Sequence, residues 1–571
     1  MVKFERIKRK TRPAPRAASV LGTAAAALLG PALLPGLAWA GGGPGNVLVL
    51  FNADDPDSGS VAEYYAERRS LPDGALCGLG GAPLAERTLS FEDYSTFVRT
   101  PFEACLDALA EPEEIGYLVL VRGLPYRVDL PEGGFHTSLS AMLQVGATRH
   151  ETSDAELAGF SAEQMFRRIQ NPFFPHDSEP QPGDYTLDNP TAAAYTAAPW
   201  WTRQPELPET FRRESGGTLG RWVMDDTLFV VTRLDGFDYD DAAALVDRGV
   251  ASDGTFPSAE LLCMAAADTA RGARDPECEY TSRMLSAAGF NAPWIAEHDE
   301  ALAGREVAAY FTGAAGLRDA IDGLTYVPGA VVDNLTSFGA VPRNWYCDAD
   351  LCPADEAQTS IARFVRAGAT GVHGTVAEPF NPVFPNAGAL MLYTAGYNLA
   401  ESFFFNQRWL YWQNLYVGDP LATPYGERPR VTGPTGAVTE GTPAVFTASH
   451  PAGIRSMTCR RGGVQVAEAD GPVLEVDLEG LGDGDSVDLF VVAVSDDEVL
   501  DRPGWPEESP LARARIQGWV RTTVEVGPPI ADEDPEPDDC ACSQARPTGS
   551  PAVLALAAFG LSRRNKRRLE A

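Results

Sequence analysis

The sequence predicts an α/β domain with a mainly parallel sheet flanked by helices, followed by a small β-sandwich. Short, continuous apolar runs such as Val47–Phe51 (VLVLF) and Tyr117–Val121 (YLVLV) alternate with segments of helical period. Such runs are typical of strands that helices cover on both faces. Beyond residue 425 the pattern changes to short alternating segments separated by turn residues. This change predicts a separate, all-β module.

The α/β domain is predicted to span residues 45–425. Its helices are expected at Ser58–Arg69, Phe91–Leu109 and Asp240–Arg248, the last with an acidic first turn that the helix dipole favours. Residues from about 136 to 220 are rich in Pro and Asn with weak periodicity, which predicts a loop-rich insertion. The expected strands are Val47–Phe51, Tyr117–Val121, Leu228–Thr232, Leu261–Ala265, Val307–Phe311, Gly329–Val332 and Gly371–Val376.

Residues 428–527 predict a small sandwich of immunoglobulin or fibronectin type. Alternating segments occur at Thr442–Ala448, Val473–Leu478 and Val487–Val494, with a turn cluster at Gly482–Asp485. The sequence from Leu478 to Leu489 resembles the E–F corner of such modules. An acidic, proline-rich linker with a cysteine motif follows at residues 528–548.

Both ends of the chain have the pattern of targeting signals. Residues 1–40 have a basic start, an apolar stretch and the small-residue site Ala38-Trp39-Ala40, which together predict a secretory signal peptide. Residues 549–571 combine a short apolar run with a basic terminus. As a helix the run reaches roughly 20 Å, against about 30 Å of bilayer hydrocarbon. It predicts a brief transmembrane stop with the basic cluster in the cytoplasm. A weak ordinary transmembrane tail is the alternative.

Cys540 and Cys542, the short apolar helix and the basic end resemble the C-terminal sorting signal of myxobacterial surface proteins. The resemblance implies that a membrane sorting protease is a partner and processes the chain near these cysteines. The expected location is the cell surface or outer envelope, with membrane association through the tail before processing.

The composition agrees with export. The formal charge is −33, and removal of the signal peptide, with its seven basic residues and one acidic residue, leaves about −39. A surface of this sign repels nucleic acid, which excludes it as a partner. The hydrophobic fraction of 44% supplies enough apolar side chains for packed cores.

Seven cysteines remain apart from the tail pair. Sequence neighbours suggest the disulfides Cys77–Cys105, Cys263–Cys278 and Cys347–Cys352, which suit an oxidising compartment. Cys459 is then unpaired, and other pairings stay open. A zinc site is the rival interpretation, but no CxxC or HxxxH spacing supports it, and no metal is expected.

Polar side chains follow many of the predicted strands, where ligands of open α/β sheets bind. Two interpretations stay open: ion pairs at the sheet edge, or an active site assembled from these residues. The candidates for catalysis are Arg122, Arg233, Asp235, Asp333, Ser337 and His373. The same positions include Asn52, Asp54, Asn334, Thr336 and Glu378.

Motifs for cofactors and common nucleophiles are missing. The sequence has no phosphate-binding loop, no dinucleotide fingerprint and no GxSxG elbow, so no cofactor is expected. Six histidines are present, and His373 is the one on a predicted core strand, where it is either a base or a satisfied core group. The acidic residues from Asp235 to Asp241 depart from a calcium loop, and helix capping explains Asp240 and Asp241.

Three segments resemble the catalytic domain of gingipain-type cysteine peptidases, which have a caspase-like fold. Phe229–Gly249 (FVVTRLDGFDYDDAAALVDRG) resembles the strand and helix that enter that domain, and Val417–Pro420 (VGDP) the motif that closes it. Gly368–Thr375 resembles its last core strand. The resemblance implies a mainly parallel, caspase-like sheet. In the family, a cysteine thiolate attacks the substrate carbonyl while a histidine moves the proton.

The chain departs from that family at the dyad. Asp333–Gly339 stands where the family has a Gly-His-Gly turn, and it contains no histidine. The following segment holds Cys347 and Cys352 in an acidic loop, without the apolar strand that presents the nucleophile. We therefore expect no thiolate–imidazolium pair.

A broader resemblance is to an uncharacterised family of exported proteins from bacteria with exosortase-type sorting systems. The matching segments are Val47–Arg69, Tyr117–Val128, Asn171–Phe174, Thr232–Gly236, Asn334–Gly339 and Glu378-Pro379. This family has no assigned activity. The expectation is an exported surface protein that binds or scaffolds an envelope ligand without catalysis. The alternative is a divergent, peptidase-like hydrolase with a rearranged active site.

Overall fold

The computed structural model describes residues 42–130, 136–145, 171, 229–345, 358–379, 381–407, 410, 412–496 and 516–528. The predicted signal peptide, most of the predicted insertion, the linker and the C-terminal tail lie outside these residues. Cys347, Cys352, Cys540 and Cys542 lie outside them as well. Within the described ranges, no helix is both long enough and apolar enough to span a bilayer.

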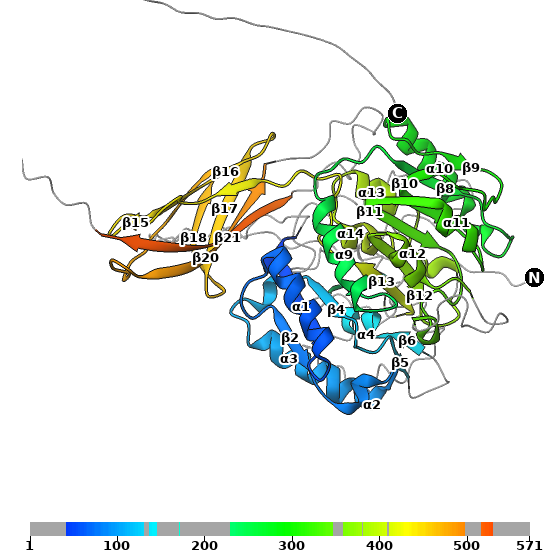
Figure 1. The fold of residues 1–571 in the computed structure, drawn as a ribbon, viewed down its shortest axis with the longest axis horizontal. Helices are drawn as coiled ribbons and strands as arrows, with labels where there is room; N and C mark the ends of the chain where they lie inside the picture. The colour runs from blue at the N-terminus through cyan, green and yellow to red at the C-terminus, as the bar shows by residue number, and fades with distance from the viewer. Residues whose placement is uncertain are drawn as a thin grey trace, which may run out of the picture. The chain divides into compact units, whose positions relative to one another are not determined.

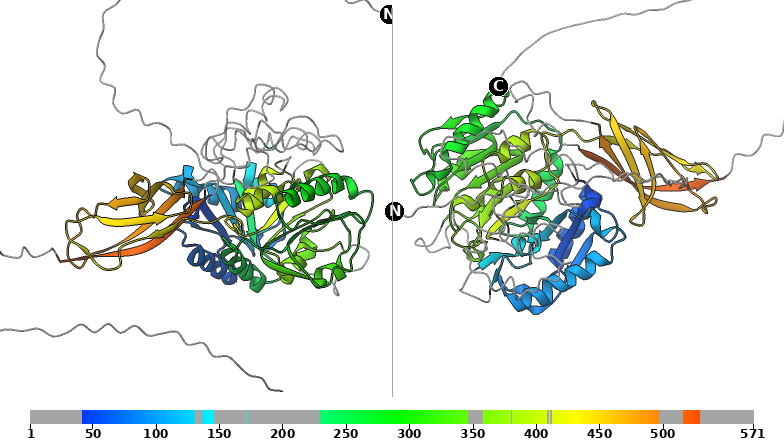
Figure 2. Two further views of the ribbon diagram at one scale, coloured as in Figure 1. Left: turned by 90° about the horizontal axis from the view of Figure 1, so that it is seen from above. Right: turned by 180° about the vertical axis from the view of Figure 1, so that it is seen from behind.

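The predicted α/β class with a mainly parallel, helix-flanked sheet is confirmed. Ten strands form one sheet in the order β2-β1-β4-β7-β13-β12-β11-β10-β8-β9. Helices lie on both of its faces (Figures 1 and 2). The strands are β1 (Val47–Asn52), β2 (Leu76–Leu79), β4 (Tyr117–Val121), β7 (Val230–Leu234), β8 (Glu260–Met264), β9 (Trp294–Ile295), β10 (Arg305–Thr312), β11 (Leu324–Asn334), β12 (Gly371–Thr375) and β13 (Asn414–Gly418).

One step in this sheet is antiparallel. β13 pairs in parallel with β7 and antiparallel with β12, with Gly371 opposite Gly418. The strands from β2 to β13 therefore run one way, and those from β12 to β9 run the other way. As a result, the carboxyl ends of the two halves lie at opposite edges of the sheet.

The helices begin where the sequence provides caps. The Asp55 side chain accepts a hydrogen bond from Asp57 N at the start of α1 (Pro56–Arg69), and Pro56 occupies the first turn. Asp238, rather than the predicted Asp240 or Asp241, caps α9 (Tyr239–Ser252). The further helices are α2 (Phe91–Tyr94), α3 (Thr100–Asp107), α4 (Leu139–Val145), α10 (Asp275–Ala287), α11 (Arg318–Gly323), α12 (Ile361–Ala367), α13 (Ala389–Thr394) and α14 (Leu399–Phe405).

The first residues of the predicted insertion are part of the fold. β6 (His136–Ser138) joins β3 (Thr88–Ser90) and β5 (Arg127–Asp129) in a small sheet. α4 follows at once, and its Leu139, Met142 and Leu143 side chains belong to the main hydrophobic core. The insertion was expected to hold loops and short helices, but its weak periodicity gave no bounds for this helix.

The C-terminal module is a sandwich of two sheets. Three strands, in the order β14-β16-β19, face five strands in the order β15-β21-β20-β17-β18. Phe446, Met457, Leu474 and Val491 lie in the hydrophobic cluster that the two sheets share. The strands are β14 (Arg430–Thr432), β15 (Val438–Thr439), β16 (Ala444–Ser449), β17 (Ile454–Arg461), β18 (Val464–Asp470), β19 (Val473–Val476), β20 (Ser486–Ser495) and β21 (Gln517–Gly527).

Cysteine pairing differs in part from the expectation. Cys77 and Cys105 form a disulfide that ties β2 to α3. Cys263 and Cys278 are buried free thiols, not the predicted bridge. They belong to β8 and α10, and burial and hydrogen bonding between a strand and its covering helix satisfy them without a covalent link. Cys459 is also free and buried, inside the sandwich.

The buried carboxylate of Asp419 holds α1 and α9 together at the centre of the sheet. Asp419, directly after β13, is fully buried and accepts hydrogen bonds from Tyr65 Oη at 2.8 Å and Arg69 Nε at 2.7 Å. Arg69 also pairs with Asp253 at the end of α9, at 2.6 Å. The place of a side chain at Gly249 in α9 is taken by Asp419. α1 and α9 therefore lie side by side around this carboxylate (Figure 1).

Replacement of Asp419 by Ala should lower the free energy of unfolding by about 3–5 kcal/mol, because Arg69 and Tyr65 lose a buried partner. Denaturant unfolding of the purified protein measures this. The matched control is Asp247→Ala, which removes the exposed Arg68–Asp247 pair and should cost less than about 1 kcal/mol. Equal losses in both variants would contradict a central role for Asp419.

Candidate functional site

The six candidate catalytic residues do not meet at one edge of the sheet. Arg122, Arg233 and Asp235 belong to the half that contains β4 and β7, whereas Asp333, Ser337 and His373 belong to the half with β11 and β12. The expectation of a single carboxyl edge is therefore wrong. The physical reason is the antiparallel step between β12 and β13.

The first group forms a closed ion cluster. Arg233 and Asp235 are fully buried and pair at 2.9 Å, and Arg122 Nη1 lies 3.0 Å from the other oxygen of Asp235. Arg233 also donates to the carbonyls of Leu124 and Pro125, both at 2.9 Å. Its guanidinium lies 4.5 Å from the ring centre of Tyr126. The charged groups of this cluster therefore contact one another and the backbone in the protein interior.

The second group is a buried chain of four polar side chains. Arg274 Nη2 donates to Asp333 at 2.9 Å, and His373 Nδ1 lies 3.1 Å from the second Asp333 oxygen. His373 Nε2 lies 3.0 Å from Asn414 Oδ1. Burial acts to raise the pKa of Asp333, but Arg274 and His373 outweigh it and hold that pKa below its usual value. His373 is therefore a satisfied core group.

Sequence reasoning missed Arg274 and Asn414. Arg274 lies in the segment between β8 and α10, and Asn414 begins β13, which was not among the predicted strands. A basic residue just before a helix gives no local sign of a distant aspartate. The pairing depends on tertiary structure alone.

Ser337 belongs to a third, exposed contact. Its hydroxyl donates to Glu378 Oε1 at 2.9 Å. Nearby, Thr336 donates to Gln358, and the Asn334 amide makes reciprocal hydrogen bonds with the backbone of Ala314 at 2.8 and 2.9 Å. The carboxyl ends of β10 and β11 are thus closed by local hydrogen bonds.

No thiol–imidazole pair occurs among the residues that the structure describes. Both ring nitrogens of His373 contact oxygen atoms. A hydrogen bond with Cys263, together with burial, raises the pKa of Cys278 well above its usual value. The described part of the chain also contains no group of three or more His, Cys, Asp or Glu residues suited to a metal ion.

A cavity of about 500 Å³ opens at the carboxyl ends of β1 and β4. The chain leaves β1 toward β2 and later reaches β4 on the other side, so this is a topological switch point, where open α/β sheets bind ligands. Sequence reasoning had placed Asn52, Asp54 and Arg122 here, but it missed Glu86 and Tyr239. The principal polar lining comes from Asn52, Asp54, Asp55, Glu86, Arg122 and Tyr239.

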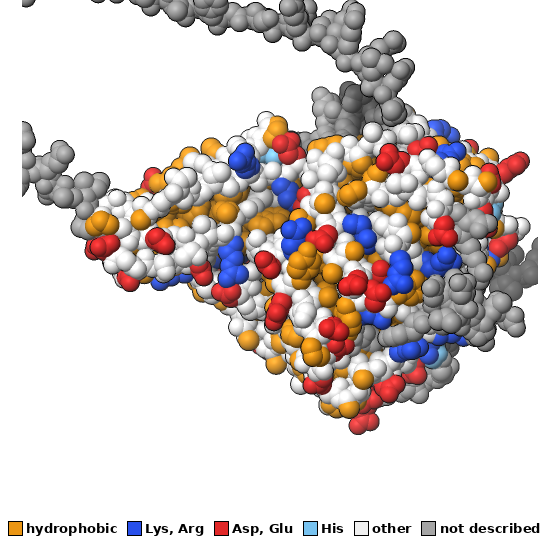
Figure 3. Space-filling view, in the orientation of Figure 1, with side chains coloured by type: hydrophobic (Ala, Val, Ile, Leu, Met, Phe, Trp, Pro, Cys, Tyr) orange, Lys and Arg blue, Asp and Glu red, His pale blue; other side chains and the backbone are white. Residues whose placement is uncertain are grey.

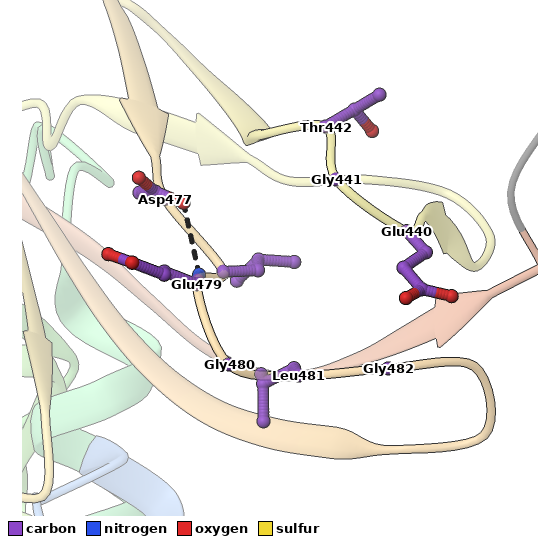
Figure 4. Close-up of a pocket in the computed structure, with 9 residues that line it drawn as sticks. Glu440, Gly441, Thr442, Asp477, Glu479, Gly480, Leu481 and Gly482 are labelled. Carbon is purple, nitrogen blue, oxygen red and sulfur yellow. Dashed lines mark hydrogen bonds between the residues drawn. The ribbon is translucent and has the colours of Figure 1, made fainter.

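A second cavity, of about 420 Å³, lies in the sandwich (Figure 4). It lies between the turn at Glu440–Thr442 and the connection at Asp477–Gly482. Its carboxylates do not gather on one point: Asp477 and Glu479 point away from Glu440 (Figure 4). Asp477 accepts a hydrogen bond from Glu479 N at 3.0 Å.

Comparison with known proteins gives a distant likeness in structure. No family model and no curated protein matches the chain. A solved structure titled "Structure of Protease" has a TM-score of 0.40 at 9% identity, over 84% of this chain and 97% of that chain. The arginine-specific cysteine proteinase gingipain R (RgpB) has a TM-score of 0.36 at 9% identity, over 85% and 98%. A complex of the Porphyromonas gingivalis RgpB pro- and mature domains has 0.36 at 8%, over 84% and 100%.

One carboxyl group near the second cluster titrates in the neutral range. Burial raises the pKa of Glu277 in α10 from 4.5 to about 7, against the opposing effect of Arg274. Glu277 accepts hydrogen bonds from Asn386 at 2.8 Å and from Ala387 N at 3.2 Å. It therefore ties α10 to the segment that follows β12.

Stability should fall as the pH rises from about 4.5 to about 7, because the folded protein binds the Glu277 proton more tightly than the unfolded chain does. Glu277→Gln should remove this dependence. Between pH 5 and pH 8 the free energy of unfolding of the variant should rise by up to roughly 3 kcal/mol relative to that of the wild type. Denaturant unfolding across this range measures it, with the exposed Glu279→Gln as control. A pH-independent difference would contradict the raised pKa.

Proposed function

We propose that this is an exported cell-surface protein whose α/β domain, built on a peptidase-like fold, binds an envelope ligand without catalysis. The observation that carries the proposal is the division of the six candidate catalytic residues among separate contacts. Arg122 and Arg233 share the single carboxylate of Asp235, and Asp333 and His373 are held by Arg274 and Asn414. A general acid or base needs a partner proton within reach, and these groups are turned inward.

The cavity at the ends of β1 and β4 is the proposed binding site. Its volume of about 500 Å³ is in the range for small ligands, and it lies at a switch point. Charged side chains of both signs are interspersed over the face seen in Figure 3. That surface favours solubility and local recognition over broad electrostatic capture of a polyanion.

A divergent hydrolase is the second candidate, and one observation favours it. Ser337 and Glu378 form a hydrogen-bonded pair that is exposed to solvent. A carboxylate that accepts the hydroxyl proton could assist a serine nucleophile. The pair lacks a histidine: within the described residues, His373 is already held by Asp333 and Asn414.

Hydrolase profiling of the secreted protein separates the two candidates. We expect background rates for ester, peptide and glycoside substrates, unchanged in Ser337→Ala and in Asp333→Ala, because no activated nucleophile is present. The exposed Ser60→Ala is a matched control. A rate above background that Ser337→Ala abolishes and Ser60→Ala leaves intact would establish the hydrolase instead.

The tail is proposed to direct retention at the surface. Cys540 and Cys542, with the apolar run and basic end behind them, are the proposed substrate of a membrane sorting protease. Exchange of both cysteines for Ser should release or misplace the protein, measured by fractionation and immunoblotting. The neighbouring Ser543→Ala should leave retention unchanged. Equal retention of all three proteins would remove the sorting proposal.

A further inference from the structure

The cavity at the ends of β1 and β4 has a wall with three carboxylates and one guanidinium. We infer that its ligand carries a primary ammonium group, as a polyamine or an amino sugar does. The inference rests on the proposed binding function and names the chemistry of that same site. The hydrogen-bond donors and acceptors that line the cavity support it.

The side-chain donors of the wall point to protein acceptors. Arg122 donates to Asp235 at 3.0 Å and to the Gly236 carbonyl at 2.6 Å. The Tyr239 hydroxyl donates to Asp55, and the Asn52 amide donates to the Gly123 carbonyl at 3.1 Å. These contacts direct Nη1 of Arg122, the Tyr239 hydroxyl and the Asn52 amide toward acceptors of the protein itself.

The backbone donors at this edge are also engaged. Gly81 N donates to Asp54 Oδ2 at 2.7 Å. At the start of α1, Pro56 has no N–H, and Asp57 N donates to Asp55. The partial positive charge at the start of a helix attracts anions. At α1 the carboxylate of Asp55 already supplies the negative charge.

Acceptors remain available on the same wall. Asp54 and Glu86 are exposed, and a carboxylate has two oxygens with about four lone-pair sites. Asp54 uses one oxygen for Gly81 N. With Asp55 the lining holds three carboxylates against one guanidinium, that of Arg122, which shares the buried Asp235 with Arg233. A phosphate or carboxylate ligand would meet these charges unpaired.

A ligand that binds these carboxylates must bring donors, and a positive charge makes those hydrogen bonds stronger. An ammonium group supplies three N–H donors in a compact head. The cavity of about 500 Å³ also leaves room for the rest of a small molecule. Free polyamines and the amino sugars of envelope polymers share this head group, and the choice between them is left to experiment.

Titration calorimetry on the secreted protein tests the inference with four probes: cadaverine, glucosamine, glucose and acetate. We expect one equivalent of an amine to bind and the neutral and anionic probes not to bind. Asp54→Asn and Glu86→Gln should each weaken amine binding roughly tenfold, because each removes a charge-assisted contact. Asp54→Asn keeps an acceptor for Gly81 N, so the loop is preserved.

Glu92→Gln is the matched control, because Glu92 is an exposed acid of α2 that lies outside the cavity. Tighter cadaverine binding would indicate a polyamine, and tighter glucosamine binding an amino sugar; either supports the inference. Glucose or acetate binding that the cavity variants weaken would overturn the ammonium class while a binding function stands. No amine binding, or equal weakening by Glu92→Gln, would overturn it too. Failure of the binding function itself would appear separately, as hydrolysis that depends on Ser337.

Discussion

The antiparallel pairing of β12 with β13 is the constraint on which the arrangement of chemistry in this protein depends. It joins two parallel half-sheets that run in opposite directions. Asp419, the residue after β13, accepts hydrogen bonds from Tyr65 and Arg69 of α1 and so holds this helix against the junction of the two half-sheets. The orientation of the sheet centre and the packing of α1 against α9 are therefore fixed at the same point in the chain.

The charged residues on the two sides of this junction are buried in separate clusters. Arg233 pairs with Val417 of β13, whereas His373 pairs with Tyr416, so the two side chains leave the sheet on opposite faces. Each group forms its hydrogen bonds with nearby residues, as in the Arg274–Asp333 and Arg233–Asp235 pairs. Arg233 binds Asp235 and two loop carbonyls, and Arg274 binds Asp333. Both arginines therefore hold the ends of strands in place.

The sequence allowed seven of the ten strands of the main sheet to be predicted, but not β2, β9 or β13 and not the direction in which each strand runs. Apolar runs such as VLVLF and YLVLV mark buried strands whichever way they run, and β13 was not among the predicted strands. Without β13 the reversal could not be foreseen, and residues from both halves were placed together. Arg122, Asn52 and Asp54 were correctly placed at strand ends, because a position just after an apolar run needs no knowledge of direction. Glu86 and Tyr239 reach the cavity from loops and a helix start, where periodicity carries no signal.

The two halves of the sheet differ at their switch points. Each half has a switch point, between β1 and β4 in one and between β8 and β10 in the other. In the second half the segment after β8 fills the crevice: Ala267 N donates to Gly313 O at 2.8 Å, and Arg274 at its end reaches Asp333. In the first half Asp54 and Tyr239 hydrogen-bond to the rim, and space remains between them. The proposed ligand site therefore lies in the first half, whereas local hydrogen bonds close the strand ends of the second half.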